Sequence, residues 1–105
     1  MQDCQTPLQL QNWKLDDETG TLAQRVIDNW LVGLRQTNPA ILDMFYDRDI
    51  QPYRDMLPWS GEFAGKYLTS AYYIYQITRS EKLYDYIQTF IGELLGLLDE
   101  DGYLG

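Results

Sequence analysis

Residues 60–98, SGEFAGKYLTSAYYIYQITRSEKLYDYIQTFIGELLGLL, carry two successive apolar patterns of helical period. In the first, over 60–78, the apolar side chains form two stripes: Phe63, Tyr67, Ala71 and Ile74 in one, and Ala64, Leu68, Tyr72 and Tyr75 in the other. In the second, over 80–98, they form a single stripe: Leu83, Ile87, Phe90, Ile91, Leu94 and Leu98. Because only Thr78-Arg79-Ser80 separates the two patterns, they predict an antiparallel pair of helices.

Capping residues and the alternation of the two helices indicate a layered all-α fold. Ser60 and Ser80 stand where a side-chain oxygen can accept a hydrogen bond from a free N–H of the first helical turn. A helix that is apolar on two sides is usually covered on two sides, whereas its neighbour with one stripe needs cover on one side only. A two-layered ring of inner and outer helices has this alternation, and so do α-solenoids. The expected class is all-α, built from antiparallel helical hairpins.

Two further helices are expected upstream of this pair. Thr21 is a suitable cap for a helix over 21–36, in which six apolar residues share one face: Ala23, Val26, Ile27, Trp30, Leu31 and Leu34. Asn38-Pro39 predicts the start of a short helix over 39–46, because Asn is a preferred N-cap and Pro is favoured at the first helical position.

The length and these patterns set the organisation of the chain. With 105 residues and 45% apolar residues, it fits one domain or part of one, and it is not a disordered tail. Residues 1–20 show no helical period. We therefore expect an irregular N-terminal segment over 1–20 and a helical portion over 21–105.

The charged and reactive residues exclude several classes of function. The net charge is −8 with no basic cluster, so nucleic acid and anionic membrane are poor partners, since both require Lys or Arg. The chain has no histidine and a single cysteine, Cys4, which excludes histidine-based catalysis and an intrachain disulfide. The first residues do not resemble a signal peptide, and no apolar run approaches the roughly 20 residues of a membrane helix. A soluble chain is expected.

Motifs for phosphate and metal binding are incomplete. Residues 61–66, GEFAGK, resemble a phosphate-binding loop, but the glycines are one residue too close and Tyr67 occupies the position of the Ser or Thr that holds magnesium. The acidic runs 47–49 and 99–102 hint at a calcium loop, but neither supplies the glycine at the sixth position and the bidentate glutamate at the twelfth. We expect no metal site and no cofactor in this chain.

Trp59, Glu62 and Lys66 are the candidate substrate-binding residues. Aromatic faces stack on sugar rings, and a nearby carboxylate accepts hydrogen bonds from sugar hydroxyls. The competing interpretation is that Glu62 serves the helix dipole and that Trp59 fills the core beneath the loop. Glycoside hydrolysis needs two carboxyl groups around the scissile bond, and Glu62 is one candidate without a second, so no residue is assigned as catalytic. Arg48, between two aspartates, is interpreted as part of a loop salt bridge.

Three segments in order resemble a known family. The stretch 58–68, PWSGEFAGKYL, the turn before Leu83, and the ending 101–105, DGYLG, are similar to the N-terminal part of the β-L-arabinofuranosidase-like glycoside hydrolases, family 127 and its relatives. Those proteins carry a Trp-x-Gly-Glu-x-x-Gly-Lys-Tyr/Trp-Leu block, then a helical hairpin, then a Gln-x-x-Asp-Gly-Tyr-Leu segment. Here Leu98 replaces the usual Gln. The resemblance covers about residues 22–105 of the chain.

The resemblance implies an (α/α)6 barrel, or toroid, that removes arabinofuranose or related sugars from the ends of plant glycans. The family's cysteine nucleophile and its zinc, bound by cysteine and glutamate, lie far downstream, and nothing in this chain matches them. The expected function is therefore that of an N-terminal fragment of a glycoside hydrolase. It would supply scaffold and part of the glycan cleft, and it would be catalytically inactive alone.

A second hypothesis is a non-enzymatic α-helical protein-interaction module. The partners expected from the two hypotheses are a weakly bound carbohydrate and a second copy of the chain. The second copy is expected because an incomplete ring leaves apolar helix faces exposed, and such faces favour homo-oligomers.

Overall fold

The computed structural model describes residues 6, 9–52 and 61–104, and these residues form helices and no strands. The elements in chain order are the 3-10 turn η1 (Leu10–Asn12), α1 (Glu18–Val26), the π-helix η2 (Ile27–Leu31), α2 (Leu34–Thr37), α3 (Ala40–Asp47), α4 (Glu62–Thr78) and α5 (Glu81–Leu95). The all-α prediction is confirmed for this part of the chain. None of these helices has both the length and the apolar character needed to cross a membrane.

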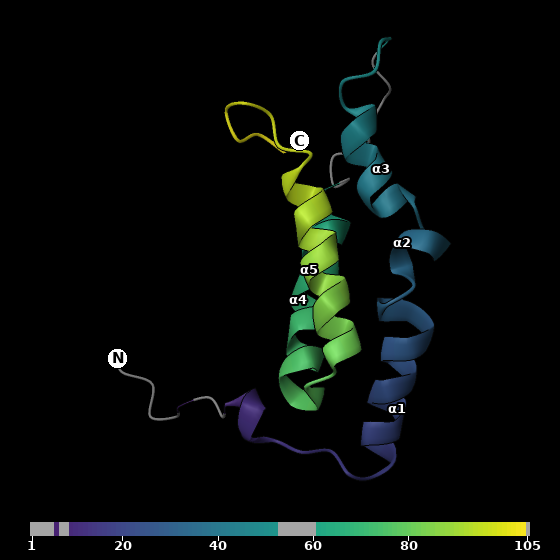
Figure 1. Cartoon of the computed structure of the whole chain (residues 1–105), viewed down its shortest axis with the longest axis vertical. Helices are drawn as coiled ribbons and strands as arrows, with labels where there is room; N and C mark the ends of the chain where they lie inside the picture. The colour runs from purple at the N-terminus through teal and green to yellow at the C-terminus, as the bar shows by residue number, and fades with distance from the viewer. Residues whose placement is uncertain (1–5, 7–8, 53–60, 105) are drawn as a thin grey trace.

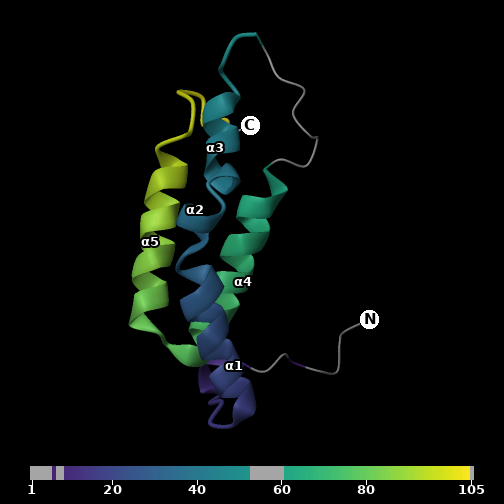
Figure 2. The same ribbon diagram turned by 90° about the vertical axis from the view of Figure 1, so that its right-hand side faces the viewer.

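The helices form a column packed against a hairpin. Elements α1, η2, α2 and α3 follow one another along the long axis, and α4 and α5 run beside them as an antiparallel pair (Figure 1). Figure 2 shows the column in front of the hairpin, with α5 on one side of it and α4 on the other. Helix α4 contacts η1, α1, α3 and α5. The expected cover of this helix on two sides is not seen in the described residues, because the buried residues of α4, Ala64, Tyr67 and Ala71, share one face.

The turn of the hairpin follows the local sequence. The side chain of Ser80 accepts a hydrogen bond from the N–H of Leu83 at 3.3 Å, which confirms Ser80 as the cap of α5. Arg79 adopts the left-handed conformation, with φ of 54°, and its N–H donates to the carbonyl of Tyr75 at 2.7 Å. A left-handed residue at this position closes the end of a helix and reverses the chain. The other predicted cap, Ser60, lies outside the described residues.

The start of α1 differs from the prediction. The helix begins at Glu18, and the carboxylate of Asp17 accepts a hydrogen bond from the N–H of Thr19 at 2.9 Å. Thr21 is therefore inside the helix, and its assignment as the cap was wrong. Asp is as good an N-cap as Thr, and it occurs here before a residue, Glu18, whose negative charge suits the first helical turn. The shorter helix α3 begins at Ala40, with Pro39 already at helical angles.

The core lies where the column meets the hairpin. Its buried members come from every long element: Ala23, Ile27, Leu31, Leu34, Ile41, Leu42, Phe45, Ala64, Tyr67, Ala71, Leu83, Ile87, Phe90 and Leu97. On α4 the buried residues Ala64, Tyr67 and Ala71 come from both predicted stripes, so the stripes are the two halves of one broad face. Phe63 and Tyr72, at the margins of that face, are exposed.

Gly20 permits a close approach of backbone to α1, and we expect Gly20→Ala to destabilise the chain. A Cβ added at Gly20 would lie 2.1 Å from the carbonyl oxygen of Leu15, so backbone must move. Overpacking of this kind costs about 1–3 kcal/mol. The matched control is Gly65→Ala in α4, where an added Cβ meets nothing within 4 Å and alanine improves helix propensity. Thermal unfolding followed by circular dichroism measures both, and equal midpoints for Gly20→Ala and the parent would contradict the prediction.

Candidate functional site

The three predicted substrate-binding residues are only partly brought together. Trp59 lies outside the described residues. Glu62 and Lys66 occupy successive turns at the start of α4 and form an ion pair with each other, with side chains 49% and 68% exposed. An exposed pair at this spacing adds little stability and exchanges readily for other partners. Lys66 is therefore held weakly by Glu62.

An open pocket of about 600 Å³ lies between the column and α4. Its described lining is drawn from η2, α2, α3 and α4 and from the residues that join them: Trp30, Leu34, Thr37, Asn38, Ala40, Ile41, Met44, Phe63, Lys66, Tyr67 and Ser70. Lys66 lines this pocket, but Glu62 does not. Glu62 instead lines a shallower depression beside it, which shares Lys66 and Ser70 with the pocket. The size and the mixture of apolar walls with a few polar groups are typical of small-ligand sites.

Two aromatic side chains stand at the pocket with part of their surface free. Trp30 comes from η2 and Phe63 from α4, and they are 49% and 50% exposed. Trp30 makes an edge contact with the ring of Tyr67, with centroids 6.3 Å apart and planes at 73°. Half-exposed rings on facing elements provide apolar surfaces on which a flat ligand can stack.

The helix that carries Trp30 is interrupted, and Tyr67 stabilises the interruption. The N–H of Val32 donates to the carbonyl of Ile27 at 3.0 Å, a five-residue spacing that defines the π-helix. The regular α-helix resumes only at Leu34, and the buried hydroxyl of Tyr67 donates to the carbonyl of Leu31 at 2.8 Å. Burial raises the pKa of Tyr67 well above its ordinary value, so the hydroxyl keeps its proton and remains a donor.

A second tyrosine stabilises the other side of the same interruption. The N–H of Arg35, in the first turn of α2, donates to the hydroxyl oxygen of Tyr86 on α5 at 2.7 Å. First-turn N–H groups have no partner within their own helix. Tyr67 and Tyr86, one from each helix of the hairpin, thus supply two bonds that the broken helix cannot make for itself.

Arg35 anchors the pocket wall to α5. Its guanidinium contacts Glu93 at 2.9 Å and Asp43 at 2.8 Å, and it donates to the carbonyl of Pro39 at 2.7 Å. The hydrogen bond with Glu93 is the main reason that the pKa of Arg35 is raised. These contacts hold the start of α3, which contributes Ala40 and Ile41 to the pocket.

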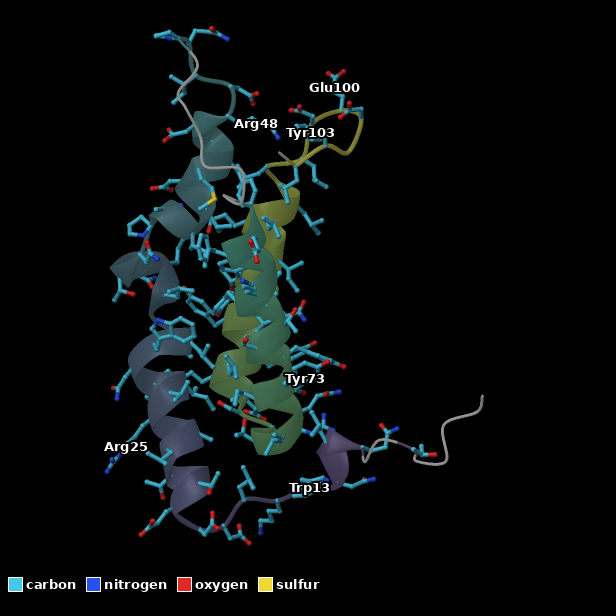
Figure 3. The ribbon with its side chains drawn as sticks, turned by 180° about the vertical axis from the view of Figure 1, so that it is seen from behind. Trp13, Arg25, Arg48, Tyr73, Glu100 and Tyr103 are labelled. Atoms are coloured by element: carbon cyan, nitrogen blue, oxygen red, sulfur yellow. The ribbon has the colours of Figure 1, made fainter. Side chains whose placement is uncertain are left out.

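Arg48 lies away from the pocket and fastens the C-terminal turn. Figure 3 labels Arg48 and Tyr103 at the same end of the molecule, opposite the end where Trp13 is labelled. Arg48 contacts Asp49 at 2.8 Å and Asp99 at 2.7 Å, and it donates to the carbonyl of Leu104 at 2.8 Å. The predicted loop salt bridge is confirmed, and it also reaches across 51 residues to Asp99.

The described lining of the pocket combines apolar surface with hydroxyl groups, one amide and one ammonium group. Its described lining contains no carboxylate, thiol or imidazole. In the described part of the chain, no three His, Cys, Asp or Glu side chains gather where they could hold a metal ion. Sequence reasoning missed Trp30 and Phe63 as pocket residues because both belong to apolar stripes, which predicted core positions. No local signal distinguishes a ring at the margin of a stripe from one at its centre.

Comparisons of the chain with protein-family models, with curated proteins and with solved structures find no match. The proposed function therefore rests on the pocket geometry and the sequence pattern.

Proposed function

We propose that this chain is the N-terminal helical portion of an (α/α)6 toroid of the glycoside-hydrolase type, arabinofuranosidase-like, acting on plant-type glycans. In this proposal it supplies scaffold and part of the glycan cleft. The observation that carries the proposal is the open pocket at which Trp30 and Phe63, both half exposed, stand together with Lys66. Sugar rings present C–H faces to aromatic side chains, while their hydroxyls need the few polar groups that such a pocket supplies.

The arrangement of α4 supports the toroidal part of the proposal. An inner helix of a two-layered ring contacts several neighbours, and α4 contacts α1, α3 and α5 through its one buried face. Helix α5 buries the first three residues of its predicted single stripe, Leu83, Ile87 and Phe90, whereas Leu98 lies beyond the helix and is exposed.

The chain alone is proposed to be inactive as a hydrolase. Cleavage of a glycosidic bond ordinarily requires two carboxyl groups about 5–9.5 Å apart, one on each side of the bond. The described lining of the pocket has none, and the carboxylate of Glu62 pairs with Lys66 beside the pocket. Catalytic groups would have to come from other parts of a complete toroid.

The sugar-binding part is tested by titrating 15N-labelled protein with arabinose. We expect the indole N–H signal of Trp30 to shift with a dissociation constant in the millimolar range, about −4 kcal/mol. Trp13 serves as an internal control, because it is equally exposed but does not line the pocket. The Trp30→Phe variant identifies the signal. If Trp30 stays unmoved at tens of millimolar, or if Trp13 shifts equally, the proposed sugar site is wrong.

A second candidate function, an α-helical interaction module that pairs with another copy of the chain, is favoured by a different observation. Leu22, Val26 and Trp30 follow one another at four-residue spacing along α1 and η2, and all three side chains are exposed. Contiguous exposed apolar residues on a helix mark interaction surfaces. Light scattering discriminates the two candidates. A dimer that Val26→Glu dissociates supports the module, and a monomer at high micromolar concentration contradicts it.

A further inference from the structure

The polar groups of the pocket favour a particular charge on its ligand. Five side chains of the described lining carry a polar group: Thr37, Asn38, Lys66, Tyr67 and Ser70. Lys66 is the one that carries a charge, and the hydroxyl of Tyr67 already donates to the carbonyl of Leu31. The hydroxyl of Thr37 already donates to the carbonyl of Gly33 at 3.1 Å. Neutral sugars present many hydroxyl donors, which carboxylate side chains bind well, but this lining offers none. It offers an ammonium group and an amide, which are suited to a ligand that accepts hydrogen bonds with a negative charge.

The ion pair between Lys66 and Glu62 indicates how Lys66 would bind an acidic ligand. The ammonium group of Lys66 pairs with the carboxylate of Glu62, and both side chains are largely in solvent. Because Lys66 lines both the pocket and the depression that contains Glu62, rotation of its flexible side chain transfers the ammonium group between them. A carboxylate on a ligand in the pocket would take the place of Glu62 as the partner of this ammonium group and form a charge-assisted hydrogen bond with it.

We infer that the pocket takes a sugar bearing a carboxylate, of the uronic acid class, in preference to the corresponding neutral sugar. This inference rests on the proposed sugar-binding function. The ring of the sugar would stack on Trp30 or Phe63, and its carboxylate would bind the ammonium group of Lys66. Lys66 is then the residue that determines specificity, while the aromatic rings serve neutral and acidic sugars alike.

The net charge of the chain, −8, repels a negatively charged sugar at long range and so opposes the attraction by Lys66. Charges more than about 8 Å apart in solvent are largely screened at physiological salt. The preference must therefore come from direct contact with Lys66, and it should be measured at physiological ionic strength, where repulsion from distant carboxylates is weak.

The test compares galacturonate with galactose. The two sugars have the same ring, and galacturonate carries a carboxylate where galactose carries a hydroxymethyl group. Following the Trp30 indole signal, we expect galacturonate to bind about fivefold more tightly, as one exposed charge-assisted contact allows. Lys66→Met should reduce galacturonate binding to the level of galactose, and Lys66→Arg should retain the preference. Glu62→Gln, which removes the competing carboxylate, should strengthen galacturonate binding.

The outcomes separate this inference from the proposed function. Equal binding of the two sugars, or a preference that persists in Lys66→Met, overturns the inference and leaves sugar binding in place. A Trp30 signal that responds to neither sugar overturns both. Because Lys66 is exposed, its variants are expected to fold, and a superimposable far-UV circular dichroism spectrum checks this.

Discussion

Phe90→Ala is expected to unfold much of the chain under conditions where the parent is folded. Phe90 is 2% exposed at the centre of α5, and its ring centroid lies 4.6 Å from that of Tyr67 on α4. Truncation of a buried phenylalanine to alanine costs about 3–5 kcal/mol, because it loses apolar burial and leaves a cavity. Domains of this size are stable by only about 5–15 kcal/mol, so a large part of the free energy of unfolding is lost.

Urea unfolding followed by far-UV circular dichroism measures this loss. The control is Leu95→Ala on the same helix, because the Leu95 side chain is exposed and its truncation should change the free energy of unfolding by about 0.5 kcal/mol or less. If Phe90→Ala and Leu95→Ala shift the unfolding midpoint equally, the core assigned to the interface between column and hairpin is wrong.

The removal of one hydroxyl group in Tyr67→Phe is expected to destabilise the chain by about 1–3 kcal/mol. The substitution keeps the ring against Phe90 but leaves the carbonyl of Leu31 without its bond from Tyr67. Tyr72→Phe on the same helix is the matched control. The hydroxyl of the exposed Tyr72 accepts a hydrogen bond from the side chain of Gln76 in a position open to solvent, where water replaces the lost partner. Equal unfolding free energies for the two variants would contradict the role assigned to Tyr67.

The same hydroxyl gives stability a predictable dependence on pH. The pKa of Tyr67 is raised in the folded chain, chiefly by burial, above the value of about 10 expected in the unfolded chain. Its contribution is therefore fully present below about pH 10 and is lost as the pH rises through the raised folded pKa. The stability difference between the parent and Tyr67→Phe should narrow in this alkaline range and remain constant at neutral pH.

Local sequence determined the helices and the turn between the last two. The apolar period over 60–98 predicted an antiparallel pair, and Ser80 caps α5 as predicted. Both depend on residues a few positions apart, because capping and helical periodicity act within a turn or two. Competition between nearby capping residues accounts for the error at α1, where Asp17 caps the helix that Thr21 was expected to cap.

Tertiary contacts decided which apolar residues are buried and where the pocket lies. Periodicity gives the angle of a side chain around its helix, but burial depends on whether another helix covers that angle. Trp30 and Phe63, assigned to the core from their stripes, are half exposed at the pocket. Of the predicted site residues, Lys66 lines the pocket, Glu62 pairs with it from outside, and Trp59 lies outside the described residues.

The break between η2 and α2 also depends on the tertiary structure. Its stabilising bonds come from Tyr67 and Tyr86, which are 36 and 51 residues from the backbone groups they satisfy. Local propensity over 21–36 favours an uninterrupted helix. The hydrogen bonds that compensate for the interruption come from distant residues, so the local sequence cannot predict it. The sequence by itself thus determined an all-α chain with a helical hairpin. Packing of the column against that hairpin decided the interruption, the exposure of Trp30 and hence the pocket.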